Sequence, residues 1–315
     1  MALAAIDLAI IAAGTGGFVI VGRDAGDRAG RSVASAGDIN GDGFDDLIVG
    51  AYRGDSASNG RVDAGESYVV FGRSGGFGAT IDFAALAATA GFVILGAEEG
   101  DESGRSVASA GDINGDGYDD IIIGALSGDA AGNAKANAGE SYVVFGRSDG
   151  FGTSIDLASL GTGGFVIYGQ DAADRSGWFV SSAGDVNGDG FDDLIVGSPY
   201  ADGAGNATSN TGETYVVFGK AGGFGTALDL SAIAAGTGGF VLRGQDVEDQ
   251  AGKAVSAAGD LNGDGYADLL IGARYADGPT NSTTNAGGGY LVFGGSAIGS
   301  GGGALLAASS PPAAS

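Results

Sequence analysis

A nine-residue stretch rich in oxygen donors occurs four times in the chain, first at residues 38–46. Each copy has a carboxylate or amide side chain at positions 1, 3, 5 and 9, glycine at position 6, and a main-chain carbonyl to offer at position 7. Such donors in a tight turn are typical of Ca²⁺ sites, and the chain has no Cys or His to favour zinc or copper. The sequence therefore predicts four Ca²⁺ sites, whose candidate ligands are Asp38, Asn40, Asp42, Phe44 and Asp46; Asp112, Asn114, Asp116, Tyr118 and Asp120; Asp185, Asn187, Asp189, Phe191 and Asp193; and Asp260, Asn262, Asp264, Tyr266 and Asp268.

These stretches differ from an EF-hand loop, which needs a bidentate Glu at position 12 and a helix on each side. Position 12 is instead aliphatic, Val49 in the first copy, and the flanking residues favour strands. The ion is therefore expected in the turn of a β-hairpin. A turn without metal is the alternative, because Asp, Asn and Gly also favour tight turns. The retention of every donor position in four copies favours the metal.

Composition argues against several classes of function. The formal net charge is −25, which disfavours binding to nucleic acid and to anionic membrane surfaces. The absence of His removes the commonest general base, and the absence of Cys removes thiol chemistry, so we expect no enzyme active site. No apolar run reaches the ~18 residues of a membrane span. We therefore expect no nucleic-acid partner and no membrane insertion.

A repeat of four copies extends to Gly294. Its register is visible in Phe18, Phe92, Phe165 and Phe240, which are spaced by 74, 73 and 75 residues. Each copy contains four short strand candidates; in the first copy these are Arg31–Ala36, Asp46–Ala51, Glu66–Gly72 and Gly91–Gly96. The first strand consists of small residues, which suit a crowded axis, and the second is a continuous apolar run, which suits burial on both faces. The pattern predicts an all-β fold, a β-propeller of four blades that are each a four-stranded antiparallel sheet.

The predicted propeller occupies residues 1–294, with blades at about 31–96, 105–169, 177–244 and 252–294. The fourth copy ends with its third strand, whereas residues 17–22 align with the fourth strands. We therefore expect Gly17–Gly22 to pair beside Gly289–Gly294 and to close the ring within a monomer. The same pairing between chains would give a strand-exchanged oligomer. Residues 295–315, rich in Gly, Ala and Ser, are interpreted as a low-complexity tail.

The side opposite the Ca²⁺ loops is expected to bind a ligand. The long polar loops there differ most among the copies and could contact an unknown protein or carbohydrate; they span 52–65, 126–139, 200–212 and 274–287. An acidic ring on this side is also possible, formed by solvated turn acids or by a second ligand site, from Asp27, Asp101, Asp174 and Asp249. Trp178 stands where the other copies have Arg31, Arg105 and Lys253, as a packing variant or as a binding aromatic residue.

The nonapeptide, followed by Leu-Ile-Val-Gly-Ala and then Tyr-Val-Val-Phe-Gly, resembles the FG-GAP repeat of integrin α-subunit propellers and their bacterial relatives. The resemblance implies that the candidate ligands hold Ca²⁺ between the first two strands of each blade. It implies a calcium-dependent, non-catalytic binding, adhesion or structural scaffold, extracellular or on the cell surface, of a bacterial type exported without a cleaved N-terminal signal. A module of a secreted carbohydrate- or lipid-active enzyme, or a self-assembling surface protein, is the alternative.

Overall fold

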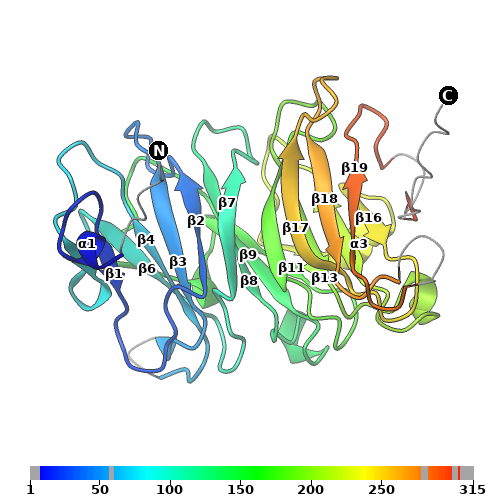
Figure 1. Ribbon diagram of the computed structural model, residues 1–315, viewed down its shortest axis with the longest axis horizontal. Helices are drawn as coiled ribbons and strands as arrows, with labels where there is room; N and C mark the ends of the chain where they lie inside the picture. The colour runs from blue at the N-terminus through cyan, green and yellow to red at the C-terminus, as the bar shows by residue number, and fades with distance from the viewer. Residues whose placement is uncertain (1–7, 57–59, 278–282, 300–303, 306–315) are drawn as a thin grey trace, which may run out of the picture.

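Four β-sheets stand side by side in the computed structural model, which describes residues 8–56, 60–277, 283–299 and 304–305 (Figure 1). The antiparallel strands of each sheet come from one repeat, and we number these blades one to four along the chain; a separate two-stranded sheet, of residues 19–21 and 80–82, lies beside blade one. The first strands are β2 (Ser32–Gly37), β7 (Ser106–Gly111), β12 (Phe179–Gly184) and β17 (Ala251–Gly259). The second strands are β3 (Asp46–Ala51), β8 (Asp120–Ala125), β13 (Asp193–Ser198) and β18 (Asp268–Ala273). The third strands are β4 (Glu66–Val70), β9 (Glu140–Val144), β14 (Glu213–Val217) and β19 (Gly288–Val292), and the fourth are β6 (Gly91–Leu95), β11 (Gly164–Tyr168) and β16 (Gly239–Arg243).

The strands confirm the expected all-β architecture of antiparallel sheets. In blade one, β2, β3, β4 and β6 lie in that order and pair antiparallel throughout, within two residues of the expected bounds. Every residue of β8 is buried, as its unbroken apolar sequence requires, because a blade lies on each side of it.

The hydrophobic cores lie between neighbouring blades. Ile48 and Val69 of blade one pack in one cluster with Val107, Ile123 and Tyr142 of blade two. The first strands β2, β7, β12 and β17 contact one another in this order along the chain. Their small residues allow this close approach, which places the first strands at the inner side of the row.

Glycine is required where two blades touch through their backbones. A side chain on Gly50 would overlap the carbonyl oxygen of Gly104 in the next blade, and Gly124 stands in the same way against Gly177. These contacts explain the glycine at the next-to-last position of the second strand in the first three repeats.

A fifth short strand in each repeat was not expected from the sequence. These strands pair in parallel with the fourth strand of the preceding repeat; they are β5 (Thr80–Asp82), β10 (Ser154–Asp156), β15 (Ala227–Asp229) and β20 (Ala304–Leu305). An Asp at the end of β5, β10 and β15 accepts a main-chain N–H and begins a helical turn. The helical segments are α1 (Leu8–Ala12), α3 (Leu230–Ala234), and the 3₁₀ turns η1 (Phe83–Ala85), η2 (Ala131–Asn133), η3 (Leu157–Ser159) and η4 (Ala204–Asn206). The strand β20 lies within residues 295–315, most of which are outside the described residues, and the interpretation of that segment as a low-complexity tail stays a prediction.

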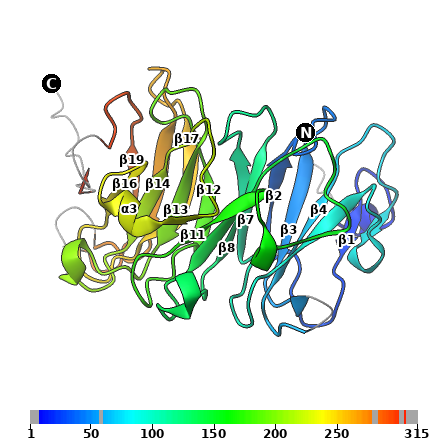
Figure 2. The same cartoon turned by 180° about the vertical axis from the view of Figure 1, so that it is seen from behind.

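The expected closure of the ring within the chain is wrong. The N-terminal strand β1 (Val19–Val21) pairs in parallel with β5, and not beside β19. Among the described strands, β19 pairs only with β18, so blade four lacks a fourth strand. β1 docks on blade one by the edge that every fourth strand turns to the fifth strand of the following repeat, and because the row of blades is open its other edge does not reach β19. Figures 1 and 2 show β1 and β19 at opposite ends of the row.

Candidate functional site

The four nonapeptide loops join the first and second strands, at one end of each blade. In the first loop the N–H groups of Asp42 and Gly43 donate to the two carboxylate oxygens of Asp38, over 3.0 and 2.9 Å. Asp42 N–H also donates to Asn40 Oδ1 at 2.8 Å, and Phe44 N–H donates to Asp42 Oδ1 at 3.0 Å. The same bonds recur in the other three loops. The structure thus brings positions 1, 3 and 5 together around one turn.

The carboxylate at position 9 anchors each loop to its blade. Asp46 is fully buried and accepts N–H groups from Ile39 at 3.3 Å and from Gly72 at 2.8 Å. Burial, together with the charges of Asp42 and Asp38, raises the pKa of Asp46 to about 6. Burial likewise raises the pKa of Asp120 to about 8 and that of Asp193 to about 7. The shifts come first from burial, and the other carboxylates of the same loop add a smaller contribution in the same direction.

The donor set of each loop is compatible with a hard cation such as Ca²⁺. Three carboxylates, an amide oxygen and a main-chain carbonyl are oxygen ligands, and a buried carboxylate whose neighbours are acidic gains from a positive ion. In the part of the chain that the structure describes, however, no group of three or more Asp, Glu, His or Cys side chains is arranged to hold a metal. The carboxylates instead accept N–H groups of their own loop. Calcium binding therefore stays a prediction.

The four acidic turn residues are buried, so solvated turn acids are the wrong interpretation. They lie on the side of the variable loops, as expected, where the N–H groups of Arg53 and Ser127 donate to the main-chain oxygens of Asp27 and Asp101. Burial raises the pKa of Asp101 to about 7, aided by Glu140. The pKa is raised in the same way at the other three, Asp27, Asp174 and Asp249. Because the row of blades is open, the four residues do not complete a ring.

A cluster of cations and aromatic rings lies on the same side, at the starts of the first strands. The Lys253 ammonium is 3.5 Å from the centroid of the Trp178 ring and 4.6 Å from that of Tyr200, whose hydroxyl is 3.1 Å away. The Arg105 guanidinium lies over both Trp178 and Tyr52, 5.1 Å from each centroid. We define this cation–aromatic cluster as Arg28, Tyr52, Arg53, Arg105, Arg175, Trp178, Tyr200 and Lys253.

The cation–aromatic cluster is a local concentration of positive charge in an acidic protein. Burial and the charges of Arg274, Arg105 and Arg175 lower the pKa of Lys253 to about 8. Glu102 partly offsets the cluster, at 3.6 Å from Arg53 and 3.5 Å from Arg105. The sequence signal for the cluster was the alignment of Trp178 with Arg31, Arg105 and Lys253. This alignment did not reveal that cations and aromatic rings from neighbouring blades stack on one another.

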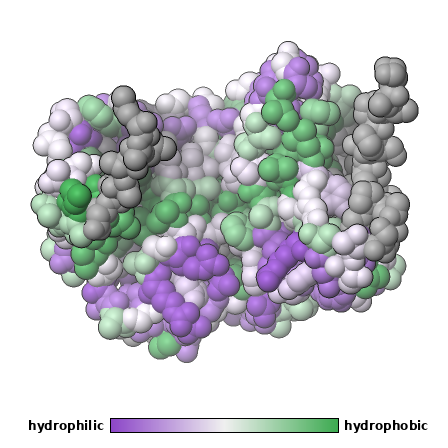
Figure 3. Space-filling model, viewed as in Figure 1, coloured by the Kyte–Doolittle hydropathy of each residue, from purple (hydrophilic) through white to green (hydrophobic). Residues whose placement is uncertain are grey.

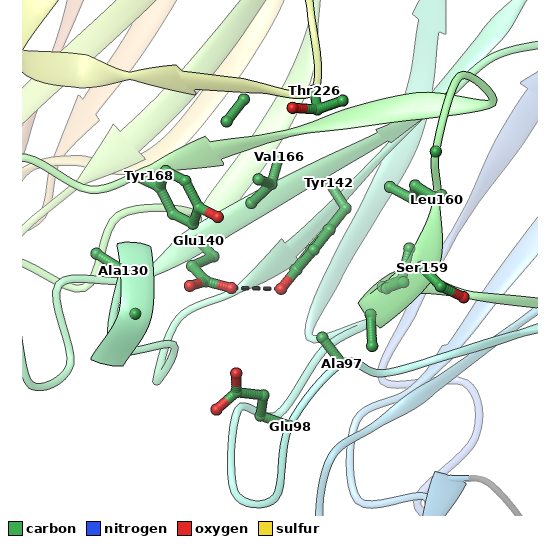
Figure 4. Close-up of a pocket in the computed structure, with 15 residues that line it drawn as sticks. Ala97, Glu98, Ala130, Glu140, Tyr142, Ser159, Leu160, Val166, Tyr168 and Thr226 are labelled. Atoms are coloured by element: carbon green, nitrogen blue, oxygen red, sulfur yellow. Dashed lines mark hydrogen bonds between the residues drawn. The ribbon is translucent and has the colours of Figure 1, made fainter. Parts of the chain in front are cut away.

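A cavity of about 340 Å³ beside blade two contains the buried Glu140, and no Lys or Arg is among the described residues that line it (Figure 4). Glu140 hydrogen-bonds the Tyr142 hydroxyl, and burial raises its pKa. Tyr168 stands opposite Glu140 in the sheet, whereas Arg243 stands opposite Glu213 in blade three and donates to it at 2.9 Å. The cavity beside Glu140 therefore occupies the position that the Arg243 side chain fills in blade three.

The repeats, their sheets and their loops together define the protein class. The FG-GAP repeat family matches residues 29–70, 103–144, 176–217 and 251–292, which is more than half of the chain. The chain therefore belongs to the FG-GAP repeat family. The matched segments begin at the first strand or three residues before it and end with the third strand, and each contains one complete nonapeptide loop.

Similar curated proteins fall into two groups. The chain is 29% identical over 260 residues to integrin alpha pat-2 of Caenorhabditis elegans, which covers 78% of the chain and 18% of that integrin. It is 36% identical over 178 residues to the phosphatidylinositol-glycan-specific phospholipase D of Bos taurus, which covers 56% of the chain and 19% of the phospholipase. The chain thus spans less than a fifth of the length of these relatives. No helix among the described residues has the length and apolar character needed to span a membrane.

Proposed function

We propose that this chain is a calcium-dependent binding or adhesion module that works outside the cell and is not itself catalytic. The observation that carries the proposal is the cation–aromatic cluster on the variable-loop side, where several cations gather within the acidic chain. Membership of the FG-GAP family and the similarity to integrin α chains support a binding role. Aromatic faces and partly desolvated cations together suit a ligand that carries carboxylate or sulfate groups, such as an acidic polysaccharide or an acidic protein surface.

Calcium would be held by positions 1, 3, 5, 7 and 9 of each loop, with Asp38, Asn40, Asp42, Phe44 and Asp46 as the first set. Its charge would offset the repulsion among three carboxylates in each loop. The buried Asp46 already joins its loop, through Gly72 N–H, to the segment that follows the third strand, so a stiffened loop would stiffen the blade. Four divalent ions would bring the formal charge from −25 to about −17.

Calorimetry with Ca²⁺ tests the metal part of the proposal. We expect four ions per chain and dissociation constants in the extracellular range of about 10⁻⁴–10⁻³ M or tighter. We also expect EGTA to lower the melting temperature, because an ion that binds only the folded state stabilises it by about 2.7 kcal/mol per site at 100-fold excess over the dissociation constant. Fewer than three sites, or a melting temperature indifferent to EGTA, would contradict this part.

Binding to immobilised polygalacturonate, with neutral dextran as the reference, tests the ligand part. Lys253→Met and Trp178→Ala should each weaken binding to the acidic polymer about tenfold or more. Arg147→Met is the matched control, since Arg147 is a cation near the Ca²⁺ loops, where its N–H donates to the Ile39 carbonyl. An equal loss with Arg147→Met, or equal binding to both polymers, would show that the cluster is not the binding site.

The match to phospholipase D supports a second candidate, the accessory module of a lipid- or carbohydrate-active enzyme. In that case the chain would bind the substrate of a separate catalytic domain. Activity assays on phospholipids and polysaccharides, with and without Ca²⁺, separate the two proposals. Turnover by this chain alone would overturn the non-catalytic assignment.

A further inference from the structure

Every junction between blades uses two faces that the chain repeats. We call the surface that a blade turns toward the following blade its far face, and the surface turned toward the preceding blade its near face. At the first junction the far face includes Ile39, Ile48 and Val69 of blade one, and all three are 0% exposed. The corresponding far-face residues of blades two and three are equally buried.

The far face of blade four has no covering blade in the described structure. The counterparts of those three residues are Leu261, Leu270 and Leu291, which are 63%, 47% and 39% exposed. Phe293, next to the end of β19, is 53% exposed. Figure 3 shows the resulting hydrophobic area over β17, β18 and β19. A contiguous exposed apolar face of this kind marks an interaction surface.

The near face of blade one is uncovered in a matching way. Val33 in β2 is 66% exposed, whereas its counterparts Val107 and Val180 are each 4% exposed at the junctions. The N-terminal segment covers only the outer part of this face, where Phe18 and Ile20 pack against blade one. These two residues therefore already occupy positions that belong to the outer strand of a preceding blade.

The loop ends of the two faces are also complementary. At the first junction Asp119 Oδ2 accepts the N–H of Asp38 in the preceding loop at 2.8 Å, and the second junction repeats this bond at 3.0 Å. The ring of Tyr118 lies against Gly41 of the preceding loop. In blade one the corresponding side chains, Phe44 and Asp45, are exposed. In the last loop no atom lies within 4 Å of the place where a side chain on Gly263 would begin.

We infer that the far face of blade four binds the near face of blade one in a second copy of this chain. The junction would repeat the three that the chain already contains. Asp45 of the second copy would accept the Asp260 N–H, its Phe44 would cover Gly263, and its Val33 would pack on the exposed leucines. Its β1 would lie beside β19 as β6 lies beside β4, and so supply the fourth strand of blade four.

Two copies suffice to complete the arrangement. Blade one, with β2 and β3, and blade four, with β17 to β19, both lie toward the viewer in Figure 1, so the two uncovered faces are on the same side of the molecule. A twofold axis on that side brings each far face onto the near face of the other copy and closes eight blades into a ring. This inference depends neither on calcium nor on a ligand.

Light scattering over a range of concentrations tests the inference on the full chain. We expect about twice the chain mass of 30.3 kDa. Leu270→Asp, on the far face, and Val33→Asp, on the near face, should each give a monomer. Val62→Asp is the matched control, because Val62 is 50% exposed on a variable loop away from both faces. This variant should remain a dimer, and circular dichroism should show all three variants folded.

A mixture of the two monomeric variants gives the sharpest result. Val33→Asp keeps an intact far face and Leu270→Asp keeps an intact near face, so together they should form a 1:1 dimer through one unaltered junction. A wild-type monomer at every concentration up to about 100 μM would overturn the inference, leaving other repeats or another protein as the partner. A dimer of either variant alone would also overturn it, and a mass that grows with concentration beyond two copies would overturn the closed ring.

Discussion

Replacing Tyr168 by arginine should stabilise the protein at neutral pH, because it gives the buried Glu140 a cation. Glu140 is 6% exposed and faces Tyr168 across the sheet. At the same position of blade three, Arg243 donates its Nε–H to Glu213 at 2.9 Å. The cavity of about 340 Å³ beside Glu140 leaves room for the longer side chain.

The size of this stabilisation and its pH dependence follow from the protonation state of Glu140. Burial raises its pKa, as do the negative charges of Glu98 and Asp129. Above the ordinary glutamate pKa of about 4.3, the folded state therefore retains a proton that the unfolded state releases, and stability falls as the pH rises. A hydrogen bond to a charged group contributes about 1.5–3 kcal/mol. Because packing of the tyrosine ring is lost, we expect a net gain of about 1–2 kcal/mol at pH 7.5, or about 2–5 °C, and little change at pH 4.5.

Thermal unfolding of Tyr168→Arg at pH 7.5 and at pH 4.5, in EGTA, measures this difference. Tyr168→Met is the matched control, with a flexible side chain and no charge. The converse change, Arg243→Met, should destabilise the protein by about 3 kcal/mol, because it leaves Glu213 buried without its cation. Equal shifts at the two pH values, or an equal gain from methionine, would refute the assignment of an uncompensated charge at Glu140.

Three further changes test other parts of the structure. Asp101→Asn should raise the melting temperature at pH 8 and leave it unchanged at pH 4.5. The reason is that the pKa of Asp101 is raised to about 7, so its ionisation on going from pH 4 to pH 7 opposes folding. Asp149→Asn, at an exposed position, is the control in the same thermal melts. Gly115→Ala should lower the free energy of unfolding by about 1–3 kcal/mol in chemical denaturation, because Gly115 has a φ of +73° and the Phe191 ring lies against it. An unchanged free energy of unfolding would show that this contact can give way. Asp120→Ala should reduce the Ca²⁺ count from four to three in calorimetry, and an unchanged count would remove position 9 from the ligand set.

Local sequence predicted most of the strands and all four loops. Alternating small and apolar runs between glycines were enough to place β2, β3, β4 and β6, because each strand is short and is bounded by residues that end it. The spacing of Asp38, Asn40 and Asp42 was enough to bring three polar side chains around one turn, since contacts within nine residues depend on little else. The repeat period gave the number of blades and the family resemblance.

Contacts between blades could not be obtained in the same way. Whether the row of blades closes into a ring depends on the angle between neighbouring blades at each junction, and no local sequence pattern encodes the sum of these angles. The stacking of Lys253 on Trp178 joins neighbouring blades, and the missing cation at Glu140 depends on which residue a different strand places opposite it. The position of β1 was mispredicted because a fourth strand has two edges, one for the third strand of its own blade and one for the fifth strand of the following repeat, and only the tertiary structure showed that β1 uses the second, with β5. The sequence thus determined what each repeat forms, and the packing of blade against blade determined which faces and charges remain uncovered.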